Sequence, residues 1–306
     1  SSPSSPYTRG LLACKPGPGE LPARLPTVGD FLSGKSPEPA KARKMTRPSD
    51  IQPLLEIRKL STYFHGRKKG TGVKAVDQVS IRLFRGETLG LVGESGCGKT
   101  TLGRTILQLI KATSGEIIYN GVPLTGLRER ELRAFRKKIQ IVFQDPYSSL
   151  NPGMTIGRML TEPMRVHGIG RNGRERLERA SVLLNRVGLG EEDLTRYPHQ
   201  FSGGQRQRIG IARALATDPE FLILDESVSA LDVSVQAQVL NLLNDLKDEF
   251  GLTYIFISHD LSVVRYMSDR IMVMKEGQMV EEAASSELFE NPSTSYTREL
   301  LDAIPV

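Results

Sequence analysis

The chain has 306 residues, of which 41 are Lys or Arg and 35 are Asp or Glu, so its formal net charge is +6. This length provides for one large domain or two small ones, and no apolar run approaches the roughly 20 residues of a membrane helix. The two cysteines, Cys14 and Cys97, exclude a disulfide framework and a four-cysteine metal site within the chain. Because the sequence shows no signal peptide, we expect the protein to function in a reducing cytoplasm.

The first 53 residues differ from the rest in composition. They hold ten of the 18 prolines and a local charge of +4, from eight basic and four acidic residues. The remainder, with 33 basic and 31 acidic residues, carries only +2, so the total charge indicates no broad nucleic-acid-binding face. Residues 33–53 are therefore expected to be a solvated linker, which is favoured over a nucleic-acid-binding arm.

The start of the chain resembles its end. Residues 2–16 (SPSSPYTRGLLACKP) and 291–305 (NPSTSYTRELLDAIP) agree at 8 of 15 positions when aligned without gaps. The chain also begins with Ser rather than Met. We therefore expect a fragment of a longer tandem protein, with residues 1–32 as the C-terminal tail of a preceding unit. Chance similarity of two short helices is the alternative.

From residue 54 onward, short apolar runs alternate with longer amphipathic stretches. Strands are predicted at 54–60, 76–84, 88–92, 139–143, 221–225, 253–258 and 270–275, and helices at 99–110, 174–187, 205–216, 233–250 and 261–267. This alternation predicts an α/β fold with a largely parallel sheet. The polar, Gly-containing stretch at about 150–205 is expected to be a helical insertion.

A glycine-rich loop follows the predicted strand 88–92. Residues 93–100 (GESGCGKT) fit the pattern G-x-x-x-x-G-K-[ST] between a strand and a helix. Glycines let backbone N–H groups point at phosphate oxygens, Lys99 adds positive charge for the β- and γ-phosphates, and Thr100 offers a hydroxyl to Mg²⁺. A plain glycine-rich turn is the alternative. The predicted nucleotide contacts are Gly93, Glu94, Ser95, Gly96, Cys97, Gly98, Lys99, Thr100 and Thr101, with Cys97 as a small filler.

A second apolar strand ends in two acids, in the sequence FLILDE at 221–226. An acid at a strand tip beside a phosphate loop can hold Mg²⁺, which assigns Asp225 to the metal. The next acid, Glu226, can deprotonate an attacking water. Such a strand alone is common and mostly structural, but after a phosphate loop it predicts the second half of a hydrolytic nucleotide site.

Further motifs carry a resemblance to the ATP-binding-cassette (ABC) ATPases. FSGGQ at 201–205 resembles the family's signature motif, Gln144 in VFQDP its Q-loop, SALD at 229–232 its D-loop and His259 in ISHD its switch histidine. The resemblance covers about 54–306. It implies a P-loop NTPase fold with a RecA-like core, an antiparallel β subdomain and a helical subdomain. It also implies ATP and Mg²⁺ as cofactors and ATP hydrolysis as the activity.

The resemblance also implies roles for individual residues. Catalysis falls to Lys99, Gln144, Glu226 and His259, Mg²⁺ binding to Thr100, Gln144 and Asp225, and adenine stacking to Phe64, with Tyr63 the alternative. The family packs two cassettes head to tail, so each ATP would lie between one phosphate loop and the other cassette's signature. The nucleotide contacts from that side are Ser202, Gly203, Gly204, Gln205 and Asp232.

Narrower features resemble the oligopeptide/dipeptide importer branch. They are QDPYSSLNP at 144–152, DESVSALDVSVQ at 225–236 and NPSTSYTRELL at 291–301, where Ser295 stands in place of a frequent Pro. The implied domains are a tail of a preceding cassette (1–32), a linker (33–53), an ABC ATPase domain (54–290, helical subdomain about 150–205) and a C-terminal extension (291–306).

The implied function is that of a peripheral ATPase on the cytoplasmic side of the inner membrane, powering import of peptides or a related solute. Its partners would be a second cassette (an upstream copy or a separate chain), membrane permease subunits and, indirectly, a substrate-binding protein, with no nucleic acid. A non-transport ATPase acting on ribosome or DNA is the alternative. Because an ATPase subunit need not touch cargo, dipeptides, oligopeptides, glutathione and nickel all stay open.

The family resemblance implies that the segment at about 144–166 contacts the permease. Its apolar residues and prolines suit a docking surface, and ordinary helix packing is the alternative for each. These residues are Leu150, Pro152, Met154, Ile156, Met159, Leu160 and Pro163.

Overall fold

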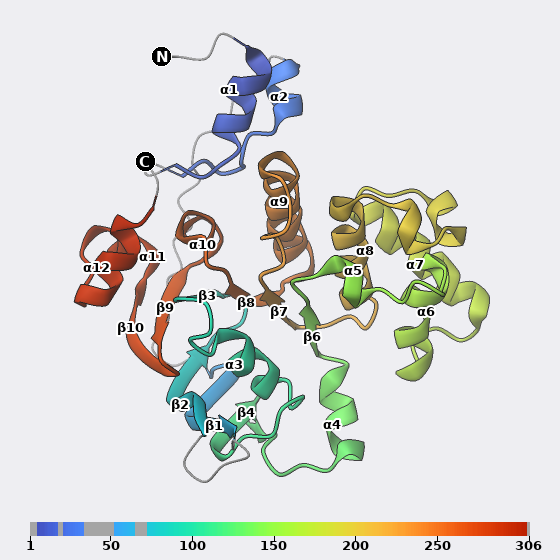
Figure 1. Ribbon diagram of the computed structural model, residues 1–306. Coiled ribbons are helices and arrows are strands. Elements are labelled where there is room, and N and C mark those ends of the chain that lie inside the picture. Colours follow the sequence, from blue (N-terminus) through green and yellow to red (C-terminus); the bar gives the residue numbers. More distant parts are fainter. Residues whose placement is uncertain (1–4, 18–20, 34–51, 65–71, 305–306) are drawn as a thin grey trace. The chain divides into compact units, whose positions relative to one another are not determined.

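The computed structural model describes residues 5–17, 21–33, 52–64 and 72–304 (Figure 1). The chain divides into two compact units. The helical unit comprises residues 1–15, 24–37 and 135–250, and the sheet unit comprises residues 16–23, 38–134 and 251–306. Most of the predicted linker, residues 34–51, lies outside the described residues, as do positions 2–4 and 305 of the internal similarity.

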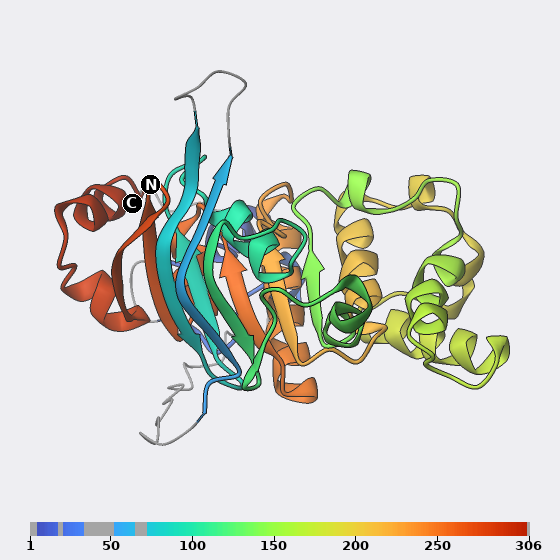
Figure 2. The ribbon, with the colours of Figure 1, turned by 90° about the horizontal axis from the view of Figure 1, so that it is seen from below.

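The sheet unit contains an antiparallel sheet with the strand order β2-β1-β4-β5. Its strands are β1 (Leu55–Phe64), β2 (Val73–Leu83), β4 (Ser114–Tyr119) and β5 (Val122–Pro123). Figure 2 shows β1 and β2, in blue and cyan, running side by side along their length. The hairpin β4–β5 was not predicted, although its turn, Asn120-Gly121, has the positive φ values and the residue types of a two-residue hairpin turn.

The second strand group of the sheet unit has the order β10-β9-β3-β8. The central strand β3 (Thr88–Val92) pairs in parallel with β8 (Thr253–Ile257) and β9 (Arg270–Lys275), and β10 (Gln278–Ala284) is antiparallel to β9. Every residue of β3 and β8 is buried, as expected for continuous apolar strands covered on both faces. The helices are α3 (Lys99–Ile106), α10 (Leu261–Met267), α11 (Ser285–Glu290) and α12 (Ser295–Asp302).

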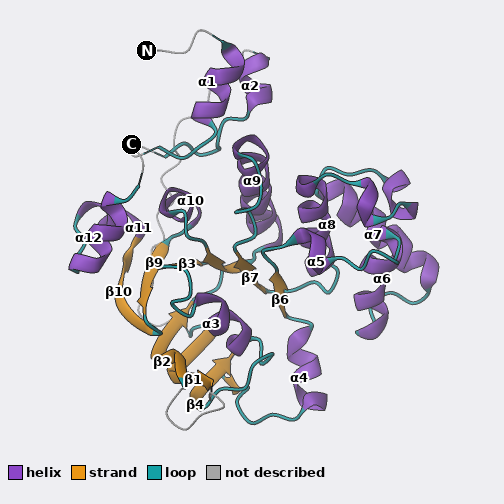
Figure 3. Cartoon of the chain, in the orientation of Figure 1, coloured by secondary structure: helices purple, strands orange, loops and turns teal. Residues whose placement is uncertain are grey.

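The helical unit is drawn mostly in purple in Figure 3. Its two strands, β6 (Ile139–Val142) and β7 (Phe221–Asp225), pair in parallel. Its helices are α1 (Pro6–Ala13), α2 (Val28–Leu32), α5 (Pro146–Ser149), α6 (Ile156–Val166), α7 (Gly173–Arg186), η1 (Glu191–Thr195), η2 (Pro198–Gln200), α8 (Gly203–Leu215) and α9 (Val233–Phe250). Helix α4 (Glu129–Arg136) spans the sequence boundary between the units.

Several predicted elements have the observed bounds: 88–92, 221–225, 270–275, 233–250 and 261–267. The helix predicted to reach 110 ends at Ile106, because Gln108 adopts a left-handed conformation with φ 56°. Strand β10 was missed because its sequence, QMVEEAA, has two adjacent acids at its centre and no alternation of apolar and polar residues. No helix among the described residues is both long and apolar enough to cross a membrane.

The apolar residues of segment 144–166 mostly face inward. Leu150, Ile156, Met159 and Leu160 are buried among the described residues of the helical unit. The docking-surface interpretation is therefore wrong for these four, and ordinary core packing explains them. Tyr147, in contrast, is 63% exposed.

Candidate functional site

The loop between β3 and α3 has a backbone that only glycine adopts without strain. Gly93, Gly96 and Gly98 have φ values of 147°, 83° and 108°. A Cβ at Gly93 would stand 2.2 Å from the Met274 carbonyl oxygen, and one at Gly98 would stand 1.9 Å from the Ala75 carbonyl oxygen. The glycines thus serve two purposes: they adopt the required backbone conformations and they let the loop approach neighbouring backbone closely.

Lys99 lies inside this loop. It is 5% exposed, and its ammonium donates hydrogen bonds to the carbonyl oxygens of Gly93 (2.7 Å) and Glu94 (2.8 Å). Because Lys99 also begins α3, its positive charge adds to that of the helix N-terminus. The N-cap Gly98 has no side chain to occupy the first N–H groups of α3, so the geometry suits an anionic group.

The other predicted loop residues differ in exposure. Glu94, Ser95 and Gly96 are exposed, whereas Cys97 is 7% exposed and its carbonyl accepts a hydrogen bond from the Gly277 N–H (2.9 Å). Burial of Cys97 agrees with its predicted role as a small filler. Thr100 and Thr101 occupy the first turn of α3.

The two acids follow β7 in the helical unit. Asp225 is 3% exposed, and Glu226 adopts a left-handed backbone conformation with φ 46°. A non-glycine residue in this conformation carries strain of about 1 kcal/mol or more, which persists where the surroundings require it. Here the Glu226 carbonyl accepts hydrogen bonds from the N–H (3.1 Å) and hydroxyl (2.9 Å) of Ser229.

Gln144 and Glu226 are 82 residues apart in sequence but meet in the structure. The Gln144 amide donates a hydrogen bond of 2.8 Å from Nε2 to Glu226 Oε2. Gln144 follows β6 and Glu226 follows β7, and the parallel pairing of these strands brings their carboxyl ends together. The structure therefore unites two residues that sequence resemblance assigned to one catalytic site.

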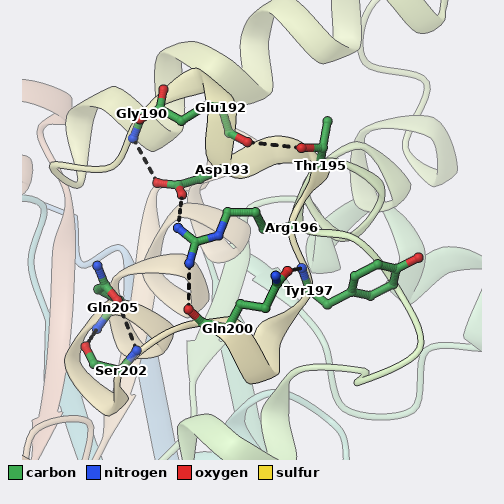
Figure 4. A network of polar contacts seen from close by, with 9 residues as sticks. All are labelled: Gly190, Glu192, Asp193, Thr195, Arg196, Tyr197, Gln200, Ser202 and Gln205. Carbon is green, nitrogen blue, oxygen red and sulfur yellow. Dashed lines mark hydrogen bonds and ion pairs between the residues drawn. The ribbon is translucent and has the colours of Figure 1, made fainter.

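The Ser-Gly-Gly segment begins α8, and Figure 4 shows Ser202 and Gln205 at this helix start. Ser202 is the N-cap, its hydroxyl accepting from the Gln205 N–H (3.3 Å), while Gln205 Oε1 accepts from the Ser202 N–H (3.0 Å). This capping box gives Gln205 a structural role beside the predicted nucleotide contact. Ser202 is exposed and Gly204 is buried, where a Cβ would stand 2.3 Å from Val235 Cγ1.

Arg196 supports this helix start and was not predicted. Its guanidinium donates to Asp193 (2.7 Å) and to the Gln200 carbonyl (2.7 Å), and lies 4.3 Å from the centroid of the Phe201 ring. The contacts hold the chain just before Ser202. In the sequence, Arg196 stands shortly before the Ser-Gly-Gly segment. No local pattern indicated that its side chain would contact Gln200 and Phe201.

The remaining predicted residues lie in loops or at element ends. Asp232 caps α9, accepting from the Val235 N–H (3.0 Å). His259 is exposed between β8 and α10 of the sheet unit. Phe64 ends β1 and is 45% exposed, whereas the Tyr63 hydroxyl donates to Asp77 (2.6 Å), a bond that lowers the pKa of Asp77.

The predicted magnesium donors fit a hard cation in type. They are the Thr100 hydroxyl, the Gln144 amide oxygen and the Asp225 carboxylate, all oxygen donors of the kind Mg²⁺ takes together with waters and phosphates. Within the described ranges, no group of three or more His, Cys, Asp or Glu residues could itself hold a metal.

Two family models match the chain. The model described as "ABC transporter" matches residues 76–229, and the model described as "Oligopeptide/dipeptide transporter, C-terminal region" matches residues 280–306. The first match contains the phosphate loop, the Gln144 segment, the start of α8 and both acids. The second contains the strand β10 from residue 280 onward and the helices α11 and α12.

Similar proteins agree with these matches. The oligopeptide transport ATP-binding protein OppF of Bacillus subtilis is 56% identical over 254 residues, which cover 83% of each chain. The glutathione import ATP-binding protein GsiA of Escherichia coli K12 is 48% identical over 315 aligned residues, and this chain spans half of its length.

Solved structures show the same fold. The dimeric post-hydrolysis structure of the ATP-binding cassette MJ0796, bound to ADP and Pi, has a TM-score of 0.68 at 31% identity, over 76% of this chain and 98% of that one. CbiO1 of Clostridium perfringens has a TM-score of 0.69 at 27% identity, over 79% and 92%. These likenesses confirm the predicted α/β cassette fold.

Proposed function

Because the chain belongs to the ABC transporter family of ATP-binding proteins, we propose that it is the ATP-hydrolysing subunit of an importer for oligopeptides or a related small solute. The observation that carries this proposal is the loop at 93–100, where three glycines have positive φ and the Lys99 ammonium is hydrogen-bonded to two loop carbonyls. The relatives named for oligopeptide and glutathione transport support import over a ribosome- or DNA-acting function.

In this proposal the phosphate loop binds the phosphates of ATP. Backbone amides of the loop and of the first turn of α3 donate to phosphate oxygens, and Lys99 neutralises charge on the β- and γ-phosphates. Phe64 stacks on adenine through its exposed ring. Thr100, Gln144 and Asp225 would hold a Mg²⁺ ion that enters with ATP, and this ion would offset the negative charge of the phosphates.

Glu226 is proposed as the general base. Its carboxylate takes a proton from the attacking water, and the hydrogen bond from Gln144 orients that carboxylate. His259 contacts the γ-phosphate, as the family resemblance implies. The strained backbone at Glu226 supports this assignment, because such strain concentrates at functional sites.

A second cassette is proposed to complete each site. The exposed Ser202, followed by Gly203 and Gly204, opens the 13-residue helix α8 and presents an anion-binding N-terminus. In a head-to-tail pair this segment, with Gln205 and Asp232, would contact ATP on the partner's phosphate loop. The dimeric structures of the MJ0796 cassette support such a pairing.

Glu226→Gln tests the general-base role. We expect ATP binding to be retained while the turnover number falls about 10²- to 10³-fold, because the amide cannot accept the proton. The control is Glu220→Gln. Glu220 immediately precedes the first residue of β7, at the opposite end of the strand from Glu226, and forms an ion pair with Lys138 at 2.8 Å. ATPase activity of Glu226→Gln equal to that of Glu220→Gln would refute the assignment.

Transport itself needs the membrane partners. We propose a peripheral position on the cytoplasmic side of the inner membrane, with permease subunits as direct partners and a substrate-binding protein as an indirect one. Co-reconstitution with a peptide permease in vesicles should stimulate ATPase activity, and peptide plus binding protein should raise it further. Stimulation by ribosomes or DNA instead of the permease would overturn the transport function.

We also propose that the chain is the second cassette of a two-cassette protein. Helices α1 and α12, which start and end at corresponding positions of the internal similarity, support this view, as does the match to half of GsiA. An antibody against the α9 region should detect a native polypeptide about twice the 33.8 kDa of this chain. A native product of about 34 kDa would contradict the tandem.

A further inference from the structure

One peptide group of the phosphate loop is held from both sides. The Gly93 carbonyl accepts from the Lys99 ammonium at 2.7 Å, and the Glu94 N–H of the same peptide group donates to the Tyr296 hydroxyl at 3.3 Å. In a trans peptide the C=O and N–H point in opposite directions. The Gly93–Glu94 peptide therefore lies between Lys99 and Tyr296, two side chains of the sheet unit nearly 200 residues apart.

Tyr296 is well placed for this contact. It is the second residue of α12 and 6% exposed, and the Lys275 ammonium lies 4.5 Å from its ring centroid. Burial raises the pKa of the phenol, so the hydroxyl stays protonated at neutral pH. The cation over the ring and the surrounding packing hold the side chain independently of its hydroxyl.

Helix α12 is itself anchored by Glu281 of β10. This carboxylate accepts from the N–H groups of Ser293 (2.7 Å) and Thr294 (3.1 Å) and from the hydroxyls of Thr294 (3.0 Å) and Thr297 (2.5 Å). Burial alone would raise the pKa of Glu281, but these hydrogen bonds outweigh it and bring the pKa down to about 2. The anchor fixes the first turn of α12, where Tyr296 lies.

We propose that Tyr296 is a positioning residue for nucleotide binding, through which the C-terminal helix α12 orients the Gly93–Glu94 peptide that holds Lys99. The inference rests on the proposed role of the phosphate loop. Glu94 and its neighbours Ser95 and Gly96 are exposed, and the Glu94 carbonyl accepts from Lys99, so the Tyr296 hydroxyl adds a restraint on the N–H side of this peptide. Ordering it before the phosphates arrive lowers the entropy that binding must overcome.

Tyr296→Phe removes only the hydroxyl and keeps the ring and the Lys275 contact. We expect the KM for ATP and the Kd for ADP to rise about three- to ten-fold, the scale of one lost hydrogen bond, with kcat within about two-fold. A KM change without a kcat change indicates lost uniform binding rather than a lost catalytic group. Thermal unfolding should shift only by the small amount that one lost hydrogen bond produces, as in the control below.

The matched control is Tyr266→Phe. It makes the same chemical change in the same unit, where the hydroxyl donates to the Ala23 carbonyl at 3.4 Å, far in sequence from the loop. Its KM for ATP should equal that of the wild type. Equal KM and Kd values for Tyr296→Phe and the wild type, with the wild type binding ATP normally, would overturn the proposal but leave the proposed function intact.

Thr297→Val tests whether α12 acts through Tyr296. This nearly isosteric change removes one bond to Glu281 at a 1% exposed position. We expect KM to rise in the wild-type background and to show no further rise in a Tyr296→Phe background, because both changes act on one contact. Additive effects would show that α12 affects nucleotide binding by another route, and would overturn the assignment to Tyr296. Failure of wild-type protein to bind ATP would instead refute the proposed function.

Discussion

The two helices that begin at glycine-rich segments, α3 and α8, use their glycines for different physical reasons. Before α3, Gly93, Gly96 and Gly98 have positive φ, and two of them leave no room for a Cβ beside backbone carbonyls. At α8, neither Gly203 nor Gly204 has a positive φ, and a serine caps the helix in the ordinary way. The α3 start needs glycine for its backbone conformation, whereas the α8 start needs it only at Gly204, where a Cβ would meet Val235.

This difference predicts how each start tolerates substitution. A clash with backbone cannot be relieved by a side-chain rotation, so the α3 loop should fail abruptly. A clash with the end of a side chain, as at Gly204, can be relieved by a small movement. The following experiments run from the largest expected effect to the smallest.

Gly98→Ala should break the phosphate loop. The new Cβ would meet the Ala75 carbonyl oxygen at 1.9 Å, at a φ of 108°, so the loop must move. We expect ATP affinity to fall on the order of 100-fold, equivalent to about 3 kcal/mol, as measured by calorimetric titration. The control is Gly96→Ala, with φ 83° but no atom within 4 Å, which carries only the conformational cost of about 1 kcal/mol. Equal losses in both variants would show that the clash is unimportant.

Glu281→Gln should weaken the hydrogen bonds that hold the start of α12 against β10 in the sheet unit. The pKa of Glu281 in the folded chain, about 2, lies below its usual 4.5, so the carboxylate stabilises the fold above pH 4.5 and loses this contribution as the pH falls toward 2. We expect thermal unfolding at pH 7 to occur at lower temperature in the variant, and the difference from wild type to shrink between pH 5 and pH 2. A difference that is independent of pH would contradict the assignment to this carboxylate.

Gly204→Ala should destabilise the helical unit by about 1–2 kcal/mol, because the Cβ meets Val235 Cγ1 at 2.3 Å. Gly203→Ala is its matched control: the nearest atom is 3.9 Å away, so stability should be unchanged or rise by up to about 1 kcal/mol from helix propensity. Denaturant unfolding measures both. Gly203→Ala should nevertheless lower ATPase activity if the segment contacts nucleotide, and full activity would argue against that contact.

Ser202→Ala should cost about 1 kcal/mol locally, because the Gln205 N–H loses its cap. Hydrogen exchange of that amide should be faster, while the amides of α3 keep their rates. Ser202→Thr retains a hydroxyl and should restore most of the protection. Unchanged exchange in Ser202→Ala would show that the capping box contributes little at this site.

The strands and loops nearest the chemistry were the most predictable from sequence. β3 and β7 are continuous apolar runs whose neighbours are glycines or acids, so both type and bounds follow from local pattern. β10 escaped prediction because two adjacent acids interrupt its apolar residues, and α12 because it is a largely polar eight-residue helix; contacts such as Glu281 with Thr297 hold the two together. The inward-facing Met159 and Leu160 were open to two readings, because an apolar residue in an amphipathic helix can face a partner or the core.

The sequence by itself determined the chemistry of this protein: a lysine in a glycine-rich loop, two acids after a buried strand, and a Ser-Gly-Gly helix start. These signals are local, since residue type and spacing set backbone conformation and charge within a few positions. Only the tertiary structure decided that Gln144 reaches Glu226, that Ala75 excludes a side chain at Gly98, and that Tyr296 holds the peptide facing Lys99. Distances between residues far apart in sequence depend on how strands pair and helices pack, which no local pattern records.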